Sequence, residues 1–238
     1  MNTNSPLPLY HLFWSMMDSI FPPACANCNT TGHIFCPSCI EKANLIGSKV
    51  CLSCGHPYKT RIPICRECIN HPQLYSGMIS WAHYESSVRN SIHTFKYQNN
   101  IALGYFFAMK LLPVVIDANW SIDLVTPVPL SKSHYKDRGY NQAALISRPL
   151  ARRLGVRHET KAIQRIRETS TQIKLSADQR FINVEGAFSG NPAKLNNKNV
   201  LLVDDVITTG ATMINCTKAL LASGASKVYC ISVARVFV

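Results

Sequence analysis

The pattern of apolar and polar positions changes character near residue 70. From there to the C-terminus, short apolar runs typical of strands alternate with longer segments in which apolar residues recur at helical spacing. The expected strands are 77–84, 122–130, 199–205 and 227–236, and the expected helices are 85–97, 101–116, 141–154, 175–184 and 211–224. Pro149 should kink or break the third of these helices. The alternation predicts an α/β fold in which helices cover a parallel sheet.

The first 70 residues follow a different pattern. Residues 9–21 form an apolar segment that we interpret as a short amphipathic helix, because Asp18 interrupts it and no positively charged segment precedes it as in a secretory signal. No apolar run reaches the ~18 residues of a membrane span. We therefore expect a cytoplasmic protein in three parts: an N-terminal helix within 1–24, a module at 25–70 and the α/β domain at 71–238.

Eight of the ten cysteines lie in the module, as four Cys-x2-Cys pairs. The pairs are Cys25 and Cys28, Cys36 and Cys39, Cys51 and Cys54, and Cys65 and Cys68. Two such pairs supply the four thiolates of a tetrahedral Zn²⁺ site, so we predict a double zinc ribbon with two structural zinc ions. The short gaps favour pairing in sequence order, and cross-braced pairing stays open. Disulfides are disfavoured without an export signal, and an iron–sulfur cluster remains an alternative.

The stretch "VLLVDDVITTGAT", residues 200–212, carries the strongest chemical signal. A buried strand runs directly into Asp204 and Asp205, which need polar partners, and paired carboxylates suit vicinal hydroxyls. The loop that follows leads into a helix, where backbone N–H groups and threonine hydroxyls can hold a phosphate. The two features together predict a site for a ribose 5-phosphate group at the carboxyl end of the strand.

This stretch resembles the phosphoribosyl pyrophosphate (PRPP) motif of type I phosphoribosyltransferases. The blocks "IHTFKY" (92–97), "PVPL" (127–130), "RGYNQ" (138–142), "TQIKLSADQR" (171–180) and "NVEGAF" (183–188) follow the cysteine pairs in order. Together they resemble the ComF/GntX family of competence-associated, phosphoribosyltransferase-like proteins over about residues 20–236. That family is associated with natural transformation, in which imported single-stranded DNA is handled on the cytoplasmic side.

The resemblance implies roles for individual residues. Asp204 and Asp205 would be the catalytic pair that holds the ribose hydroxyls, and Mg²⁺ would accompany PRPP. The segment 165–180 would be a mobile loop. His93 and His134 are weak candidates for a general base. The remaining implied PRPP contacts are Val128, Pro129, Arg138, Thr208, Thr209, Gly210, Ala211 and Thr212.

Charge adds a second kind of partner. The chain has 25 Lys and Arg against 13 Asp and Glu, a net charge of +12, and residues 132–180 hold twelve of the basic residues and only four acidic ones. Cations interleaved with tyrosines are typical of single-stranded nucleic-acid binding. A basic rim that serves only the polyanionic PRPP is the alternative. The expected DNA contacts are Lys132, Tyr135, Lys136, Arg138, Tyr140, Arg165, Arg167 and Arg180.

Three functions fit these observations. The first is a competence protein that handles single-stranded DNA during natural transformation and has a pocket for PRPP and Mg²⁺. The second is an active phosphoribosyltransferase whose acceptor is unidentified. The third is an adaptor whose zinc ribbons dock onto other proteins of the DNA-uptake machinery.

Overall fold

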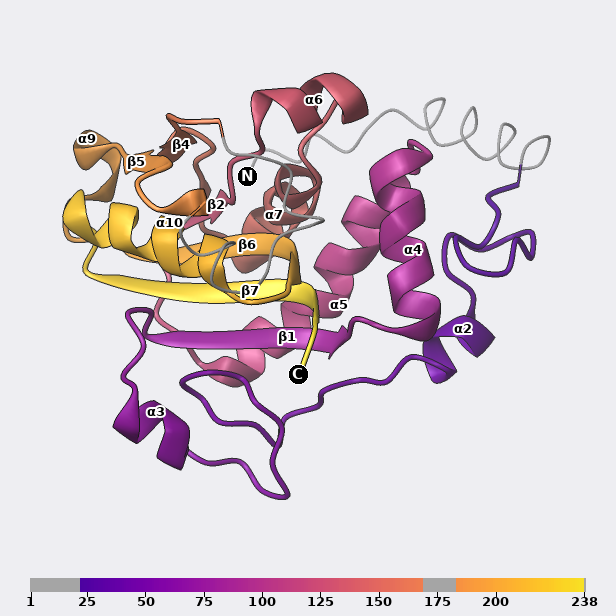
Figure 1. Cartoon of the computed structure of the whole chain (residues 1–238). Helices are drawn as coiled ribbons and strands as arrows, with labels where there is room; N and C mark the ends of the chain where they lie inside the picture. The colour runs from indigo at the N-terminus through magenta and orange to yellow at the C-terminus, as the bar shows by residue number, and fades with distance from the viewer. Residues whose placement is uncertain (1–21, 169–182, 238) are drawn as a thin grey trace, which may run out of the picture.

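A computed structural model describes residues 22–168 and 183–237. Its centre is a parallel sheet (Figure 1), as predicted, and it has five strands, one more than the sequence indicated. The strand order is β1 (Gly77–His83), β7 (Lys227–Arg235), β6 (Asn199–Ile207), β2 (Leu124–Pro127) and β3 (Arg157–His158). The proposed N-terminal helix at 9–21 and most of the one at 175–184 lie outside the described residues.

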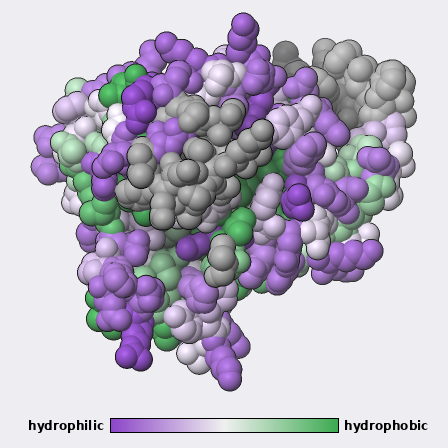
Figure 2. Space-filling model, in the orientation of Figure 1, coloured by the Kyte–Doolittle hydropathy of each residue, from purple (hydrophilic) through white to green (hydrophobic). Residues whose placement is uncertain are grey.

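Helices cover both faces of the sheet, which explains why β6 is apolar on both sides. Successive strand residues point to opposite faces. Leu201 of β6 packs in a core with α4 (Ser86–Tyr97), α5 (Ala102–Ala118) and α7 (Gln142–Leu154), whereas Leu202 packs in a second core with α10 (Ala211–Ala222). Hydrophilic residues cover most of the molecular face shown in Figure 2. In the part of the chain that the structure describes, no helix has the length and apolarity to cross a membrane.

Helix α7 continues through Pro149 without a break. Proline has no N–H group, so the carbonyl of Leu145 lacks its usual helical donor. Gly104 of α5 lies against that carbonyl: a Cβ atom at position 104 would come within 3.0 Å of the oxygen and 2.8 Å of the Leu145 Cβ. The absence of a side chain at Gly104 therefore allows α5 and α7 to pack at close range.

Several short elements were not predicted. They are β3, α6 (Lys132–Arg138), the antiparallel pair β4 (Ile163–Arg165) and β5 (Phe188–Gly190), and α9 (Pro192–Leu195). Helix α6 has no buried residue, so it leaves no apolar periodicity in the sequence. Ser131 begins it, accepting a hydrogen bond at Oγ from the His134 backbone N–H at 3.2 Å.

The cysteine module lies along the outer edge of β1. Backbone hydrogen bonds join the two: Ile46 N–H donates to Trp81, and Met78 N–H donates to Ser53. The module contains α2 (Pro37–Glu41) and α3 (Arg66–Asn70), each beginning directly after a cysteine. Phe35 enters the core beneath α5, with its ring 5.4 Å from that of Phe106. The module thus shields an edge strand that would otherwise expose unpaired backbone groups.

Candidate functional site

The eight cysteines of the module form two groups. In each group the four Sγ atoms lie within 4.8 Å of one another: Cys25, Cys28, Cys36 and Cys39 in the first, and Cys51, Cys54, Cys65 and Cys68 in the second. This confirms pairing in sequence order. Tetrahedral Zn²⁺ places its sulfur ligands about 3.8 Å apart, so both groups fit the ion.

Local hydrogen bonds stabilise a thiolate at part of each site, whereas burial raises the pKa of other ligands such as Cys39. The backbone N–H of Cys36 donates to the Cys25 Sγ at 3.3 Å, and that of Cys65 donates to the Cys51 Sγ at 3.2 Å. Hydrogen bonds from Thr30 lower the pKa of Cys28 to about 6. Since Zn²⁺ binds the thiolate form, these donors suit a structural metal site.

A cavity of about 350 Å³ opens at the carboxyl ends of β2 and β6. After β2 the chain continues to β3, toward one edge of the sheet, whereas after β6 it continues to β7, toward the opposite edge. The order of the strands therefore reverses between β2 and β6. Ligands in open α/β sheets bind at such a switch point, so the topology itself marks this cavity as a binding site.

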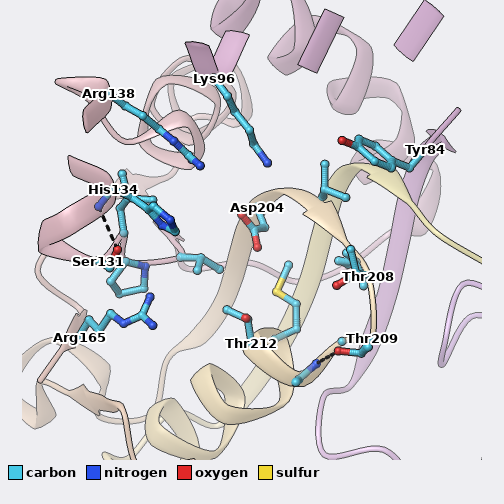
Figure 3. Close-up of a pocket in the computed structure, with 18 of the residues that line it drawn as sticks. Tyr84, Lys96, Ser131, His134, Arg138, Arg165, Asp204, Thr208, Thr209 and Thr212 are labelled. Atoms are coloured by element: carbon cyan, nitrogen blue, oxygen red, sulfur yellow. Dashed lines mark hydrogen bonds between the residues drawn. The ribbon is translucent and has the colours of Figure 1, made fainter. Parts of the chain in front are cut away.

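The loop after β6 forms one wall of the cavity (Figure 3), with Thr208, Thr209, Gly210, Ala211 and Thr212 all lining it. Gly210 has φ +80°, a left-handed conformation that glycine adopts at little cost. Helix α10 begins at the next residue, so its first N–H groups face this region with the positive end of the helix dipole. This wall is suited to a phosphate group.

The two adjacent aspartates have different surroundings, because neighbouring residues of a strand face opposite sides. Of the pair, only Asp204 lines the cavity. Asp205 is 7% exposed, and its Oδ2 lies 3.0 Å from the Nζ of Lys96 on α4. Burial, and then the charge of Asp205, raises the pKa of Asp204 to about 7, although Lys96 opposes the shift. The sequence predicted that both carboxylates face the ligand, and in the structure Asp204 lines the cavity whereas Asp205 contacts Lys96.

Cations form the wall opposite the threonines. Figure 3 shows Lys96, Arg138 and Arg165 directed into the cavity, with Asp204 between them and the loop. The Arg138 guanidinium donates to Gln142 Oε1 at 3.1 Å and lies 5.2 Å from the centre of the Tyr97 ring. Even with Lys96 paired to Asp205, the three cations outnumber the two carboxylates, and this excess of positive charge makes the cavity suitable for an anion.

Some lining residues were expected and others were not. Val128 and Pro129 line the cavity on the β2 side, where the sequence placed them. His134 also lines it, and burial, followed by the charge of Arg138, lowers its pKa. Lys96 and Tyr97 also line the cavity and were not expected there, although both lie in the block "IHTFKY" that marked the family resemblance.

The expected DNA contacts divide into groups. Arg138 and Arg165 line the cavity, and Arg180 lies outside the described residues. Lys132, Tyr135 and Lys136 are exposed on α6, with Tyr135 55% exposed.

Tyr140 and Arg167 are engaged with the protein itself. The Tyr140 hydroxyl donates to the Phe95 carbonyl, and the two rings are 6.2 Å apart, so this tyrosine packs inward and is poorly placed to stack on a base. Arg167 donates to the backbone carbonyls of Asn183 and Glu185.

Comparison with known families defines the class of the protein. Residues 16–69 match the double zinc ribbon domain, and residues 141–236 match the phosphoribosyl transferase domain. The chain therefore joins a double zinc ribbon to a phosphoribosyltransferase-type α/β domain.

Relatives along most of the chain identify the family. Competence protein F of Haemophilus influenzae is 31% identical over 230 residues, which cover 92% of this chain and 100% of the relative. DNA utilization protein YhgH of Escherichia coli K12 is 30% identical over 202 residues, covering 83% and 88% of the two chains. Competence protein ComFC of Bacillus subtilis is 27% identical over 199 residues, covering 79% and 78%. The chain belongs to this family of Competence protein F, ComFC and YhgH homologues.

Two solved structures align with part of the chain. An adenine phosphoribosyltransferase is 17% identical, with a TM-score of 0.36, and the alignment covers 60% of this chain and 75% of that one. The allosteric regulatory enzyme of purine biosynthesis is 24% identical, also with a TM-score of 0.36, and the alignment covers 55% and 24%.

Proposed function

We propose that this chain is a cytoplasmic competence protein that handles single-stranded DNA and binds PRPP with Mg²⁺ in the cavity beside Asp204. The names of its relatives, Competence protein F and DNA utilization protein YhgH, support the role in DNA uptake and use. The observation that carries the ligand proposal is the cavity itself, where a helix N-terminus and a threonine-rich loop face three cations.

The 5′-phosphate belongs at the loop from Thr208 to Thr212. Backbone N–H groups at the start of α10 and the threonine hydroxyls can donate to phosphate oxygens. A Cβ atom at Gly210 would meet no atom within 4 Å, so the space in front of this residue is open to a ligand. A hydrogen-bonding wall with open space in front of it fits a phosphate better than an apolar group.

The ribose and pyrophosphate belong between Asp204 and the opposite wall. Asp204 supplies carboxylate oxygens for the ribose hydroxyls and for Mg²⁺, which, when bound, neutralises phosphate charge. Lys96 and Arg138 line the cavity where the pyrophosphate would lie, beside Val128 and Pro129. In this arrangement Asp205 is a positioning residue, because its ion pair holds the ammonium group of Lys96.

Exposed groups on α6 are suited to DNA. Lys132 and Lys136 are exposed cations on this helix, and the exposed ring of Tyr135 lies between them in sequence. A strand passing over α6 would run beside the cavity, since His134 and Arg138 of the same helix line it. This proximity allows PRPP and DNA to influence each other's binding.

Phosphoribosyl transfer to an acceptor is a second candidate function. Tyr84 and Tyr97 line the same cavity as Asp204, and their rings could stack on a planar acceptor. A transferase would release pyrophosphate from PRPP only when the right acceptor is present. A screen of nucleobases for pyrophosphate release therefore separates this function from ligand binding alone.

Calorimetry with zinc-loaded protein tests the ligand proposal. We expect PRPP with Mg²⁺ to bind the wild type, to bind Asp204→Asn much more weakly, and to bind the control Glu41→Gln normally, since Glu41 is exposed on α2. In parallel, Lys132→Glu with Lys136→Glu should weaken binding of a labelled single-stranded oligonucleotide. Equal PRPP affinity in Asp204→Asn and wild type would contradict the assignment of the cavity.

A further inference from the structure

A second group of cations lies away from the cavity, in an open groove between α5 and α7. Its lining includes Tyr105 of α5, Arg148, Arg152 and Arg153 of α7, and His158 of β3. The groove encloses about 970 Å³, compared with about 350 Å³ for the cavity.

The three arginines share the outer side of α7. Arg148 and Arg152 are one helical turn apart and share a face, and Arg153 follows Arg152 directly; all three are exposed, while Ile146 and Leu150 are buried on the inner face. Within residues 22–168 and 183–237, none of the three forms an ion pair with a carboxylate. Helix α7 also contains no acidic residue.

The helix dipole explains only part of this charge. Arg152 and Arg153 are in the last turn of α7, where cations stabilise the helix C-terminus. Arg148 lies one helical turn before Arg152, outside the last turn, so the helix dipole does not account for its charge. Three neighbouring guanidinium groups without an acidic partner repel one another, so a bound polyanion would stabilise this surface.

An aromatic ring completes the groove. Tyr105 is 51% exposed, and its hydroxyl accepts a hydrogen bond from the Arg153 Nη2 at 2.8 Å, which holds the ring beside the cations. His158 lies within hydrogen-bonding distance of the Ser147 Oγ, at 2.9 Å. Burial, and then Arg148, lowers the pKa of His158, so the imidazole is neutral near pH 7 and adds no charge to the arginines.

We propose that this groove is a binding surface for single-stranded DNA, in which the arginines contact phosphates and Tyr105 stacks on a base. Exposed aromatic rings beside cations are how proteins bind single strands without reading their sequence. The inference rests on the proposed role in DNA handling and adds a second contact surface to it. Along α7, Arg152 is roughly 15 Å from Gln142, which holds Arg138 at the cavity. DNA in the groove and PRPP in the cavity can therefore be bound together.

The test uses the full zinc-loaded chain and a fluorescently labelled oligo(dT), with binding followed by anisotropy at several salt concentrations. The variant is Arg148→Glu with Arg152→Glu, and the matched control is Lys198→Glu with Lys227→Glu. Both control residues are exposed on the structure, and both pairs change the net charge equally. We expect the arginine variant to bind roughly tenfold more weakly. The slope of log K against log salt concentration should be less steep by about 1.4, because two phosphate contacts are lost. The control should behave as the wild type.

Further variants keep the test independent of folding. Arg148→Gln with Arg152→Gln removes the two charges without reversing them, so it also tests the groove if the Glu variant disturbs the fold. This variant should weaken DNA binding as well. Tyr105→Ala should weaken binding at least about fivefold, whereas Tyr105→Phe retains the ring and should bind nearly as wild type. PRPP titration checks that the cavity is intact in every variant.

The outcomes separate this inference from the function on which it rests. If the wild type binds DNA and the arginine variants bind it equally well, the groove is not the DNA surface, while the proposed function stands. If the wild type binds no oligonucleotide at low salt, both proposals fail. If the arginine variants lose only binding to vesicles containing phosphatidylserine, the groove contacts membrane lipid and the DNA assignment is overturned.

Discussion

Replacing Asp204 with asparagine should make the protein more stable at pH 8. The carboxyl is partly buried beside a second carboxylate, and its pKa rises from 3.8 to about 7. Between these two values the folded protein holds a proton on Asp204 more tightly than the unfolded chain does. The free energy of unfolding of the wild type therefore falls as pH rises through this window.

The pKa values set the size of the effect. Raising the pKa from 3.8 to about 7 corresponds to roughly 4 kcal/mol as an upper limit, and we expect about 2 kcal/mol because water in the open cavity screens the charge. Asparagine is neutral at every pH, and its side-chain oxygen can still accept the Asp205 N–H bond, which measures 2.9 Å in the wild type. The stability difference between Asp204→Asn and wild type should thus begin to appear near pH 4, at the pKa of the unfolded chain, and should grow to about 2 kcal/mol by pH 8.

Urea unfolding of zinc-loaded protein at pH 5, 6, 7 and 8 measures this difference, and Glu41→Gln controls for the loss of an exposed carboxylate. Zinc release at low pH affects all three proteins alike and cancels in the comparison. A difference that stays constant across pH, or an Asp204→Asn protein that is less stable at pH 8, would refute the reasoning. In the wild type, Mg²⁺ with PRPP should restore stability at pH 8, because it favours the ionised carboxylate.

Three further predictions concern other parts of the structure. Lys96→Met leaves Asp205 buried without its partner and should lower the free energy of unfolding by about 3–5 kcal/mol, whereas adding Asp205→Asn should recover much of the loss in the same urea assay. Gly104→Ala pushes a methyl group into α7 and should cost about 1–3 kcal/mol; an unchanged urea midpoint would contradict the close packing. Replacing Cys51 and Cys54 with serine should remove one of two bound zinc ions, measured by metal analysis, and a protein that keeps both would disprove the second site.

The sequence predicted local chemistry well. Zinc ligands separated by only two residues are constrained by the chain itself, so the Cys-x2-Cys pairs indicated both sites and favoured the pairing that the structure shows. The strand–loop–helix from 200 to 212 could be predicted for the same reason, because its apolar run and its threonine–glycine turn are adjacent in sequence. Short polar elements such as α6 were missed because they bury no side chain.

The tertiary structure decided which residues meet. Two adjacent aspartates are equivalent in sequence, but the faces of the sheet direct Asp204 to the cavity and Asp205 to Lys96. The groove beside Tyr105 likewise exists only because α5 and α7 pack closely. The sequence alone thus determined the fold class, the zinc ligands and the phosphate-type loop, since these depend on neighbours along the chain. The partners of the charged groups depend on packing between distant segments, and only the folded structure shows them.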